Sequence, residues 1–353
     1  MNTTYGSTPA DLGYYFPAEW HMHEATWLSW PHNKASWPGK IESIYYNYAR
    51  FVKEIAQGEK VRINVCDEAM KYNAISWLQM AGTDLSQVEF YMHPTNDAWC
   101  RDHGPAFLIN TSVHPPQKAI VDWGYNAWGG KYPPYHLDDV IPTLIAKRFN
   151  LPVFYPNIIM EGGSVEFNGS GVVLTTTSCL LNKNRNPHLS QKEIESYLIN
   201  YYGVNTVWWL DDGIAGDDTD GHIDDITRFV NTNTVVTVIE SNPDDENYEP
   251  LQKNLHTLQT FRINGEKLNI ITLPMPKPVY YNNTRLPASY ANFYICNHAV
   301  IVPTYQDHDN DMLAIEILKS CFKDRAVVGI DSTDIIWGLG SFHCLSQQEP
   351  VCT

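Results

Sequence analysis

The chain has 353 residues, of which 43% are hydrophobic and 18% are charged, so it can bury a large core. Acidic residues outnumber basic ones by 40 to 24, which gives a net charge of -16. Such a surface repels nucleic acid and anionic membranes and suits a small cationic ligand, although acidity that serves solubility alone explains the same count. We therefore expect neither a nucleic-acid partner nor a membrane partner.

The segment from Met1 to Gly13 lacks the basic start and apolar stretch of a signal peptide. No run in the chain approaches the ~18 apolar residues that span a bilayer. The seven cysteines are odd in number and include no CxxC pair, which disfavours a disulfide framework and a zinc knuckle. We expect a reduced, cytoplasmic protein that uses no metal and no cofactor.

Apolar residues recur at helical spacing in five segments, which are Ile41 to Gln57, Asp67 to Met80, Leu137 to Phe149, Ser190 to Tyr202 and Asp309 to Phe322. The fourth segment starts with Ser190 as N-cap and has Glu193 three residues later, which predicts a capping box. The run Asp307-His-Asp-Asn-Asp311 is similar to a calcium loop. It lacks the glycine and the distal glutamate of an EF-hand, so we expect it to cap the helix that follows.

Between these helices the sequence predicts pairs of strands joined by polar turns. Each pair has Asn or Gly between two apolar runs, and the pairs span Pro105 to Trp123, Ser164 to Leu174, Ile226 to Val238 and Asn292 to Pro303. A unit that recurs at roughly 60–70 residues favours a radial array of about five units, with an open α/β sheet as the alternative. No low-complexity linker divides the chain, so we expect one domain over residues 1–353.

The C-terminal stretch Gly338-Leu-Gly-Ser-Phe-His-Cys-Leu-Ser-Gln-Gln-Glu-Pro350 is too apolar for a frayed tail. We predict an ordered strand that docks against earlier strands and delivers Cys344 as a nucleophile. His343 would then point to the opposite face, so we do not choose it as the base.

A second dense stretch runs from Asp217 to Asp225 and is centred on His222. If it is extended, Asp218, Asp220, His222 and Asp224 share one face. Carboxylates beside a histidine stabilise its imidazolium, which suits a general acid/base. A solvated acidic loop is the alternative, but the apolar residues that follow indicate partial burial.

Three further stretches carry candidate residues. Trp99 and Asp102, within Asn96 to Pro105, offer an aromatic face beside a carboxylate and could cradle a delocalised cation, or Asp102 caps a turn. Glu161 precedes two glycines, where a sharp bend often exposes a site residue. The segment Asn126 to Lys131 predicts either close packing or a mobile lid, and packing is favoured.

One chemistry unites these pieces. Carboxylates around a cysteine raise its pKa, a cost that makes sense when the substrate is itself a cation. A guanidinium fits, because its planar N–H groups pair bidentately with carboxylates. The thiolate attacks the central carbon, ammonia leaves, and water hydrolyses the resulting thiouronium adduct to a ureido product.

These residues resemble the agmatine deiminase and bacterial peptidylarginine deiminase group of guanidine-modifying enzymes. The similarity covers nearly the whole chain and rests on the stretches Pro17 to Pro31, Asn96 to Pro105, Asn126 to Gly130, Glu161 to Gly163, Leu180 to Pro187, Asp218 to Asp224 and Gly338 to Pro350. The resemblance implies the pentein fold, which is a five-bladed α/β propeller. It also implies the catalytic set Cys344, His222, Asp102 and Asp224, in which Cys344 forms the amidino-cysteine intermediate and His222 is the acid/base.

By the same resemblance, Trp99 forms an aromatic wall, and Glu161 and Asp218 line the pocket where a distal amine is held. Asp218 stands where agmatine deiminases usually have glutamate, and Asp225 stands where they usually have asparagine. Dimers or larger assemblies are common in the family, so the resemblance allows a homo-oligomer.

The expected reaction is hydrolysis of agmatine to N-carbamoylputrescine and ammonia, a step of putrescine and polyamine biosynthesis. The alternatives are a deiminase of free or peptidyl arginine that yields citrulline and, more distantly, a cysteine amidase, a non-catalytic propeller or a zinc hydrolase. Free arginine would call for a basic residue in the pocket, and we expect Arg101 to point away from Asp102.

Overall fold

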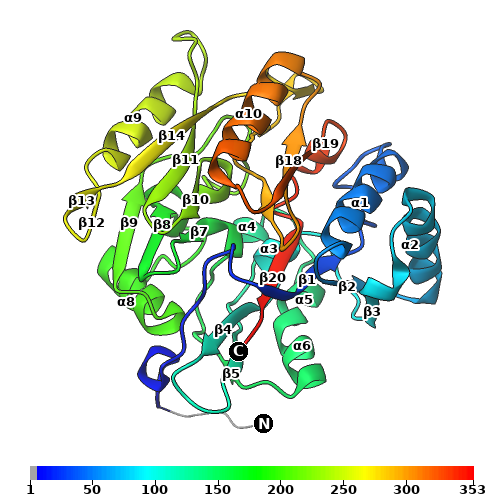
Figure 1. Ribbon diagram of the computed structural model, residues 1–353, viewed down its shortest axis with the longest axis horizontal. Coiled ribbons are helices and arrows are strands. Elements are labelled where there is room, and N and C mark those ends of the chain that lie inside the picture. The colour runs from blue at the N-terminus through cyan, green and yellow to red at the C-terminus, as the bar shows by residue number, and fades with distance from the viewer. Residues whose placement is uncertain (1–5) are drawn as a thin grey trace.

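The computed structural model describes residues 6–353, so part of the N-terminal segment assessed for a signal peptide lies outside it. Five small sheets lie around a common centre, with helices on the outside (Figure 1). Four of them have three strands each: β4 (Ala106–Asn110), β5 (Gln117–Val121) and β6 (Val153–Phe154); β7 (Val165–Phe167), β8 (Val172–Thr176) and β9 (Thr206–Leu210); β10 (Thr227–Asn231), β11 (Thr234–Ile239) and β14 (Asn269–Pro274); β17 (Tyr294–Ile295), β18 (Ala299–Thr304) and β19 (Ala326–Asp331).

The fifth sheet joins the two ends of the chain. It orders β20 (Ser346–Pro350), β1 (His23–Ser29), β2 (Lys60–Val65) and β3 (Val88–Met92). In all five sheets the first two strands are antiparallel and the third runs parallel to the second. This common pattern is the five-bladed α/β propeller predicted from the sequence.

A helix connects the second and third strand of each unit, as a parallel crossover requires. These helices are α1 (Ile41–Ala56), α6 (Ile141–Phe149), α8 (Gln191–Tyr202), α9 (Tyr248–Leu258) and α10 (His308–Cys321), and α2 (Glu68–Ala81) adds β3 to the fifth sheet. Short helices α3 (Cys100–His103), α4 (Ala127–Gly130), α5 (His136–Asp139) and α7 (Thr177–Leu180) follow strands or loops near the centre. Two small hairpins, β12 (Arg262–Ile263) with β13 (Glu266–Lys267) and β15 (Tyr280–Tyr281) with β16 (Thr284–Arg285), complete the strands.

Within residues 6–353 no helix has the length and apolar content to cross a membrane.

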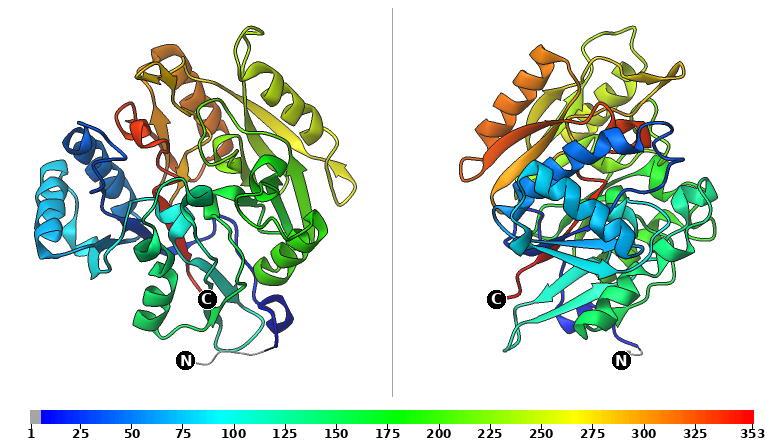
Figure 2. Two further views of the ribbon diagram at one scale, coloured as in Figure 1. Left: turned by 180° about the vertical axis from the view of Figure 1, so that it is seen from behind. Right: turned by 90° about the vertical axis from the view of Figure 1, so that its right-hand side faces the viewer.

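The last strand closes the ring. β20 pairs antiparallel with β1, with Trp27 opposite Gln347, and all five of its residues are buried. Figures 1 and 2 show this C-terminal segment running through the middle of the molecule beside β1 and β4. The docking of the C-terminal strand is thus confirmed, and it fixes the residues just before it, including Cys344, at the centre.

Local sequence explains how the outer helices form. In α1 the buried side chains Ile44, Tyr48, Phe51 and Ile55 recur at three- and four-residue spacing and face the core. In α8 the predicted capping box is present, because Ser190 and Glu193 exchange side-chain to backbone hydrogen bonds.

Several local predictions need correction. The segment Leu137–Phe149 is two helices, α5 and α6, and Pro142 lies at the start of α6, where its missing N–H costs nothing. Helix α9 was missed because Pro250 and polar residues obscure its pattern, although a proline is tolerated in a first turn. Asp307 makes no capping bond to α10, and its carboxylate accepts instead from the Lys277 N–H at 3.0 Å.

Both chemistry-bearing stretches also differ from the extended form predicted for them. Gly338 to Leu345 folds as turns, and only Ser346–Pro350 is a strand. The Asp217–Asp225 stretch is a turn that ends in a short 3-10 helix, and Asp220 has a positive φ of 70°. The alternation of side chains assumed for both stretches is therefore wrong, and their contacts decide which residues meet.

Candidate active site

A cavity of about 350 Å³ opens at the centre of the propeller. Its wall is mainly aromatic and acidic, and it includes Asp97, Trp99, Asp102, Trp128, Tyr132, Asp218, Trp337 and Cys344. Trp99 stacks on Trp37 with ring centroids 5.3 Å apart, so its ring is held rigidly at the wall. The structure thus brings Trp99, Asp102, Asp218 and Cys344 to one cavity, as predicted.

Cys344 lies in the turn before β20 and is buried, with 5% of its surface exposed. Its carbonyl accepts a hydrogen bond from the Arg101 N–H at 3.1 Å, which ties the turn to α3. A Cβ on Gly340 would lie 2.7 Å from the Trp99 ring and 3.0 Å from the Cys344 Cβ. Glycine is therefore required at position 340 for the cysteine to pack against the tryptophan.

Asn292, which the sequence analysis missed, holds this cysteine. Its Nδ2 lies 3.0 Å from the Cys344 Sγ and 2.8 Å from Asp225 Oδ1. Its Oδ1 accepts from the backbone N–H groups of His343 and Cys344 at 3.1 and 3.3 Å. The amide therefore donates a hydrogen bond to the sulfur and fixes the backbone that carries it.

Asp224 lies on the other side of the sulfur, with Oδ2 3.6 Å from the Cys344 Sγ. The same oxygen is 2.6 Å from His343 Nδ1, and His343 Nε2 is 2.7 Å from Glu19 Oε2. His343 therefore contacts the predicted guanidinium-binding carboxylate. Its exclusion as the base rested on an opposite strand face, and that reason is wrong because residue 343 is not in a strand.

Burial by itself would raise the pKa of Asp224, but the hydrogen bond and charge of His343 bring that pKa below its ordinary value. Asp224 is therefore an anion in the free protein. Among the described residues, its Oδ1 has no hydrogen-bond partner, so one lone-pair edge remains for a ligand N–H.

Asp102 faces the same centre from α3. Its Oδ1 accepts from the Gly163 N–H at 2.9 Å, and its Oδ2 accepts from Trp128 Nε1 at 2.9 Å. His222 Nδ1 lies 3.8 Å from Asp102 Oδ1. Burial raises the pKa of Asp102, and the charge of His222 opposes that shift.

Gly163 shows how closely these groups converge. A Cβ there would lie 2.5 Å from His222 Nδ1, 2.9 Å from Asp102 Oδ1 and 3.1 Å from Asp224 Oδ2. Three of the four predicted catalytic side chains therefore surround one backbone position that has no room for a methyl group.

Gly163→Ala is consequently expected to lower kcat for ammonia release by about 100-fold, because a displacement near 1 Å misaligns reacting groups by that order. The variant should keep the secondary structure of the parent, since no backbone atom is within the first contacts of the new methyl group. Steady-state kinetics and circular dichroism test this. If the Gly163→Ala enzyme keeps the parental kcat, the His222 ring can move away from the new methyl group without loss of activity.

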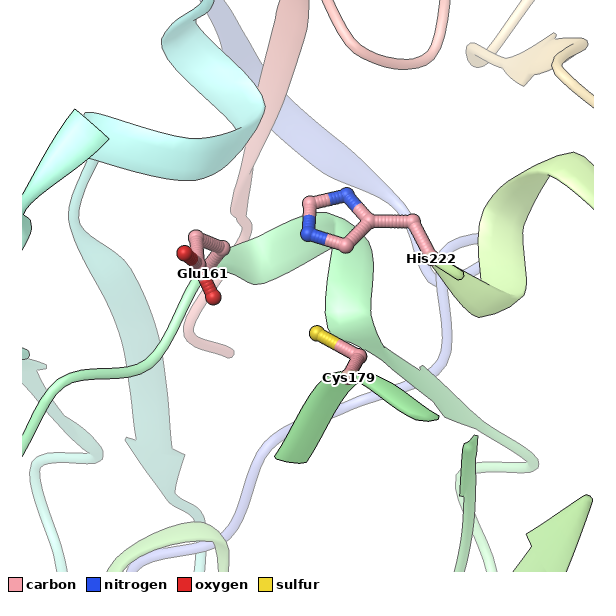
Figure 3. A group of neighbouring side chains, drawn as sticks. All are labelled: Glu161, Cys179 and His222. Atoms are coloured by element: carbon pink, nitrogen blue, oxygen red, sulfur yellow. The ribbon is translucent and has the colours of Figure 1, made fainter. Parts of the chain in front are cut away.

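Glu161 departs from its predicted place. It is fully buried, its Oε1 accepts from Arg185 Nε at 2.6 Å, and it does not line the cavity. It lies instead with Cys179 and His222, and one donor atom from each of the three falls within 4.8 Å of the others. Figure 3 shows these three side chains pointing toward one another.

Within the described residues, Glu161 Oε2 and both ring nitrogens of His222 have no hydrogen-bond partner. The role predicted for Glu161, holding a distal amine, stays a prediction, and in this geometry its carboxylate lies beside the histidine and outside the lining of the cavity. Carboxylate, thiol and imidazole groups can all bind metal ions, so Glu161, Cys179 and His222 form one group of possible metal ligands. Asp224, Asp225 and Cys344 form a second such group. One oxygen of Glu161 is already taken by the Arg185 guanidinium.

Asp218 lies at the rim of the cavity. Its carboxylate accepts from Tyr132 Oη and from Lys131 Nζ, which is 3.1 Å from Oδ1. Both partners follow α4, where Trp128 has a positive φ of 55° and is buried. Close packing of the Asn126–Lys131 segment, favoured over a lid, fits this arrangement.

Electrostatics at the centre favour a cationic ligand. Burial raises the pKa of the Cys344 thiol well above its ordinary value, and the charges of Asp224, Asp225 and Asp102 raise it further. Burial lowers the pKa of His222, but Asp102 and the Cys179 thiol outweigh it and place that pKa well above the ordinary value. The free protein thus holds a thiol and an imidazolium among carboxylates that a cation would neutralise.

A cysteine in an acidic, aromatic cavity at the centre of a five-bladed α/β propeller is the arrangement of an enzyme that attacks guanidine groups. The chain belongs to the Porphyromonas-type peptidyl-arginine deiminase family, whose model matches residues 15–350. A protein of Legionella pneumophila (strain Paris), described provisionally as an agmatine deiminase, is 39% identical over 99% of this chain and 98% of its own.

Two solved structures are similar over nearly the full length. The agmatine deiminase of Enterococcus faecalis has a TM-score of 0.92 at 31% identity and covers 100% of both chains. A variant of the C. jejuni agmatine deiminase with substrate bound has a TM-score of 0.85 at 34% identity, and the match covers 95% of this chain and 96% of that one.

Proposed function

We propose that this protein hydrolyses agmatine to N-carbamoylputrescine and ammonia. The observation that carries the proposal is that Cys344 and Asp102 line one cavity while Asp224 Oδ2 lies 3.6 Å from the Cys344 sulfur. The relatives from Enterococcus faecalis and C. jejuni, both agmatine deiminases, support it.

In the first half-reaction the substrate guanidinium lies between the carboxylates of Asp102 and Asp224. Its positive charge offsets the acids that raise the pKa of Cys344, so the thiol gives its proton to solvent most readily when the substrate is bound. The Cys344 Sγ attacks the central carbon, a C–N bond breaks, and ammonia leaves with a proton supplied by the His222 imidazolium.

The second half-reaction uses the neutral His222 left by the first. It removes a proton from water as the water oxygen adds to the carbon of the amidino-cysteine. The C–S bond then breaks to release the thiolate, and the proton of the added hydroxyl passes to the sulfur, which leaves the ureido product and the thiol. Asn292 Nδ2, 3.0 Å from the sulfur, stabilises that thiolate by a hydrogen bond. Glu161 Oε2 faces the His222 ring and would balance its charge.

The distal ammonium of agmatine fits the rim carboxylate of Asp218, where it would take the place of Lys131 Nζ, which lies 3.1 Å from Oδ1. Arg101 does not offer a competing charge in the cavity, because its side chain turns to Gln348 at 2.7 Å and to Glu19 at 3.3 Å, as predicted. A free arginine would bring its carboxylate toward Asp218, and like charges side by side cost several kcal/mol.

Ammonia release measured across agmatine, arginine, a blocked arginine peptide and methylated guanidines tests the proposal. We expect kcat/KM for agmatine to exceed that for arginine by about 100-fold, since ~2.7 kcal/mol of repulsion corresponds to that ratio. A blocked arginine peptide turned over faster than agmatine would assign the activity to peptidyl arginine instead.

Asp218→Asn is expected to raise KM for agmatine about tenfold with a smaller change in kcat, because one charged hydrogen bond to the distal ammonium is weakened. The matched control is butylguanidine, which lacks the ammonium and should show no change in KM. An unchanged KM for agmatine would separate Asp218 from substrate binding.

We further propose that residues 1–353 act as one catalytic domain without metal or cofactor, in the cytoplasm, in a step of polyamine biosynthesis. Free thiols at all seven cysteines fit a reducing compartment. Activity that survives excess chelator supports the metal-free part of this proposal. Sedimentation velocity decides whether the protein is a homo-oligomer.

A further inference from the structure

Cys66 lies outside the cavity, between the end of β2 and the start of α2. Its side chain is partly exposed. The Sγ is 3.8 Å from His32 Nε2 and 3.7 Å from the Thr95 carbonyl oxygen. A nucleophilic side chain therefore contacts a titratable one at a solvent-accessible position.

The hydrogen bonds of His32 determine its charge. Its Nδ1 lies 3.1 Å from the Trp30 carbonyl oxygen, and its Nε2 lies 3.1 Å from the Thr95 carbonyl oxygen. Because carbonyl oxygens only accept, both ring nitrogens are placed to donate, and this arrangement favours the imidazolium form of His32. Burial opposes this charge, but the contacts with Cys66 and Trp30 raise the pKa of His32 to about 9.

A cation at this distance favours the thiolate form of Cys66. Burial and the charge of Asp67 raise the pKa of Cys66, but the hydrogen bond and charge of His32 leave it below the ordinary value. Asp97 and Asp138 are the other acids that face His32, and they favour its charged form.

Two other cysteines, Cys321 and Cys352, are also partly exposed, and burial raises the pKa of each. Cys66 is thus distinguished from thiols of similar exposure by its histidine partner. Reactive cysteines in proteins have this kind of environment, in which a cation stands beside an accessible sulfur.

We propose that Cys66, paired with His32, is a reactive thiolate and a site of covalent modification by soft electrophiles and small disulfides. With an alkyl halide the sulfur forms a C–S bond and halide leaves. With a disulfide the sulfur forms a mixed disulfide and one thiolate leaves, which can be reversed by a reducing thiol. This reactivity does not depend on the proposed function.

The pair is joined to the cavity rim. Asn33, next to His32, donates from Nδ2 to Asp97 Oδ2 at 2.8 Å, and both residues line the cavity. A group attached to Cys66 would displace His32 from the Thr95 carbonyl, two residues before Asp97. We infer that modification loosens this rim and weakens binding of the cavity ligand. This second part rests on the proposed function.

Iodoacetamide labelling at pH 7, followed by peptide mass spectrometry, tests the reactivity. Cys66 should be alkylated at least about tenfold faster than Cys321 and Cys352, because each pKa unit changes the thiolate fraction tenfold. Equal rates would overturn the proposal. His32→Gln should slow the labelling of Cys66 alone. If that variant does not fold, the pH midpoint of Cys66 labelling in the parent protein, expected below that of Cys321 and Cys352, decides the same point.

Oxidised glutathione tests the link to the cavity. The treated parent protein should show a several-fold higher KM for agmatine, reversed by dithiothreitol, while Cys66→Ser treated in the same way keeps its KM. Equal loss in both proteins would place the effect at another cysteine and overturn the link. Absence of agmatine turnover before treatment would reject the proposed function and leave the labelling result standing.

Discussion

Cys344→Ala is expected to abolish ammonia release from agmatine, with a loss of at least about 10⁴-fold in kcat, because no other group can form the covalent intermediate. The side chain is small and the turn that carries it is held by Arg101 and Asn292 through its backbone. The variant should therefore fold. Initial-rate ammonia assays and thermal unfolding followed by circular dichroism measure the two effects separately.

The matched control is Cys296→Ala. Cys296 is also buried, and its sulfur contacts the Ala299 carbonyl at 3.2 Å in the sheet of β17 and β18. Its removal should cost about 1–2 kcal/mol of unfolding free energy and leave kcat unchanged. A Cys344→Ala enzyme that still releases ammonia at a rate near the parent would contradict covalent catalysis. Loss of activity in both variants would point to unfolding.

The repeated units and the central position of the C-terminal strand could be predicted because their information is local. Each strand pair has its own turn residues, and β20 is a short buried run that needs a partner. Cys344 and His222 were found for the same reason, since each lies in a dense run of glycine, acidic and apolar residues. The extended geometry assumed for those runs was wrong, yet Asp224 of the second run still lies 3.6 Å from the Cys344 sulfur.

The residues that sequence reasoning missed depend on contacts between distant parts of the chain. Glu19 meets His343 across 324 positions, and Asn292 meets Cys344 across 52. Glu19 lies in the Pro17 to Pro31 stretch that supports the family resemblance, but no local feature of that stretch or of the Asn292 strand pair assigns either residue to the site. Propeller closure alone brings them together, so a pattern within a short window could not identify them.

Glu161 illustrates a related limit. The position of Glu161 before two glycines predicted that its side chain lies at the site, and the side chain does lie near the site residue His222. Its partner Arg185, 24 positions later, turns it inward to Cys179 and His222 instead of toward the cavity. The direction of a charged side chain follows from the ion pair it makes, and that pair is not visible in the local sequence.

Asp224 and Asp225 are adjacent and buried, but their pKa values shift in opposite directions, and this difference leads to the second large effect. The pKa of Asp224 lies below its ordinary value, mainly because His343 outweighs burial. Burial and the charges of Asp224 and Asp217 raise the pKa of Asp225 well above its ordinary value. The protein therefore favours the carboxylate form of Asp224 and disfavours that of Asp225.

Asp224→Asn is expected to lower kcat/KM for agmatine by about 10³-fold. It removes the anion that pairs with both the guanidinium and His343, and breaking a buried charge pair costs about 4 kcal/mol, or about three factors of ten. Asp225→Asn replaces a side chain whose charged form is disfavoured by a neutral one of the same shape, and its Oδ1 can still accept from Asn292 Nδ2, which is 2.8 Å away in the parent. That variant should lose less than about tenfold.

Kinetics of both variants over pH 6–9, with thermal unfolding as the check on folding, compare two substitutions of identical chemistry one residue apart. Equal losses would show that Asp225 is charged or that the charge of Asp224 is not used. A large loss confined to Asp224→Asn would locate the guanidinium-binding charge on the oxygen 3.6 Å from the Cys344 sulfur.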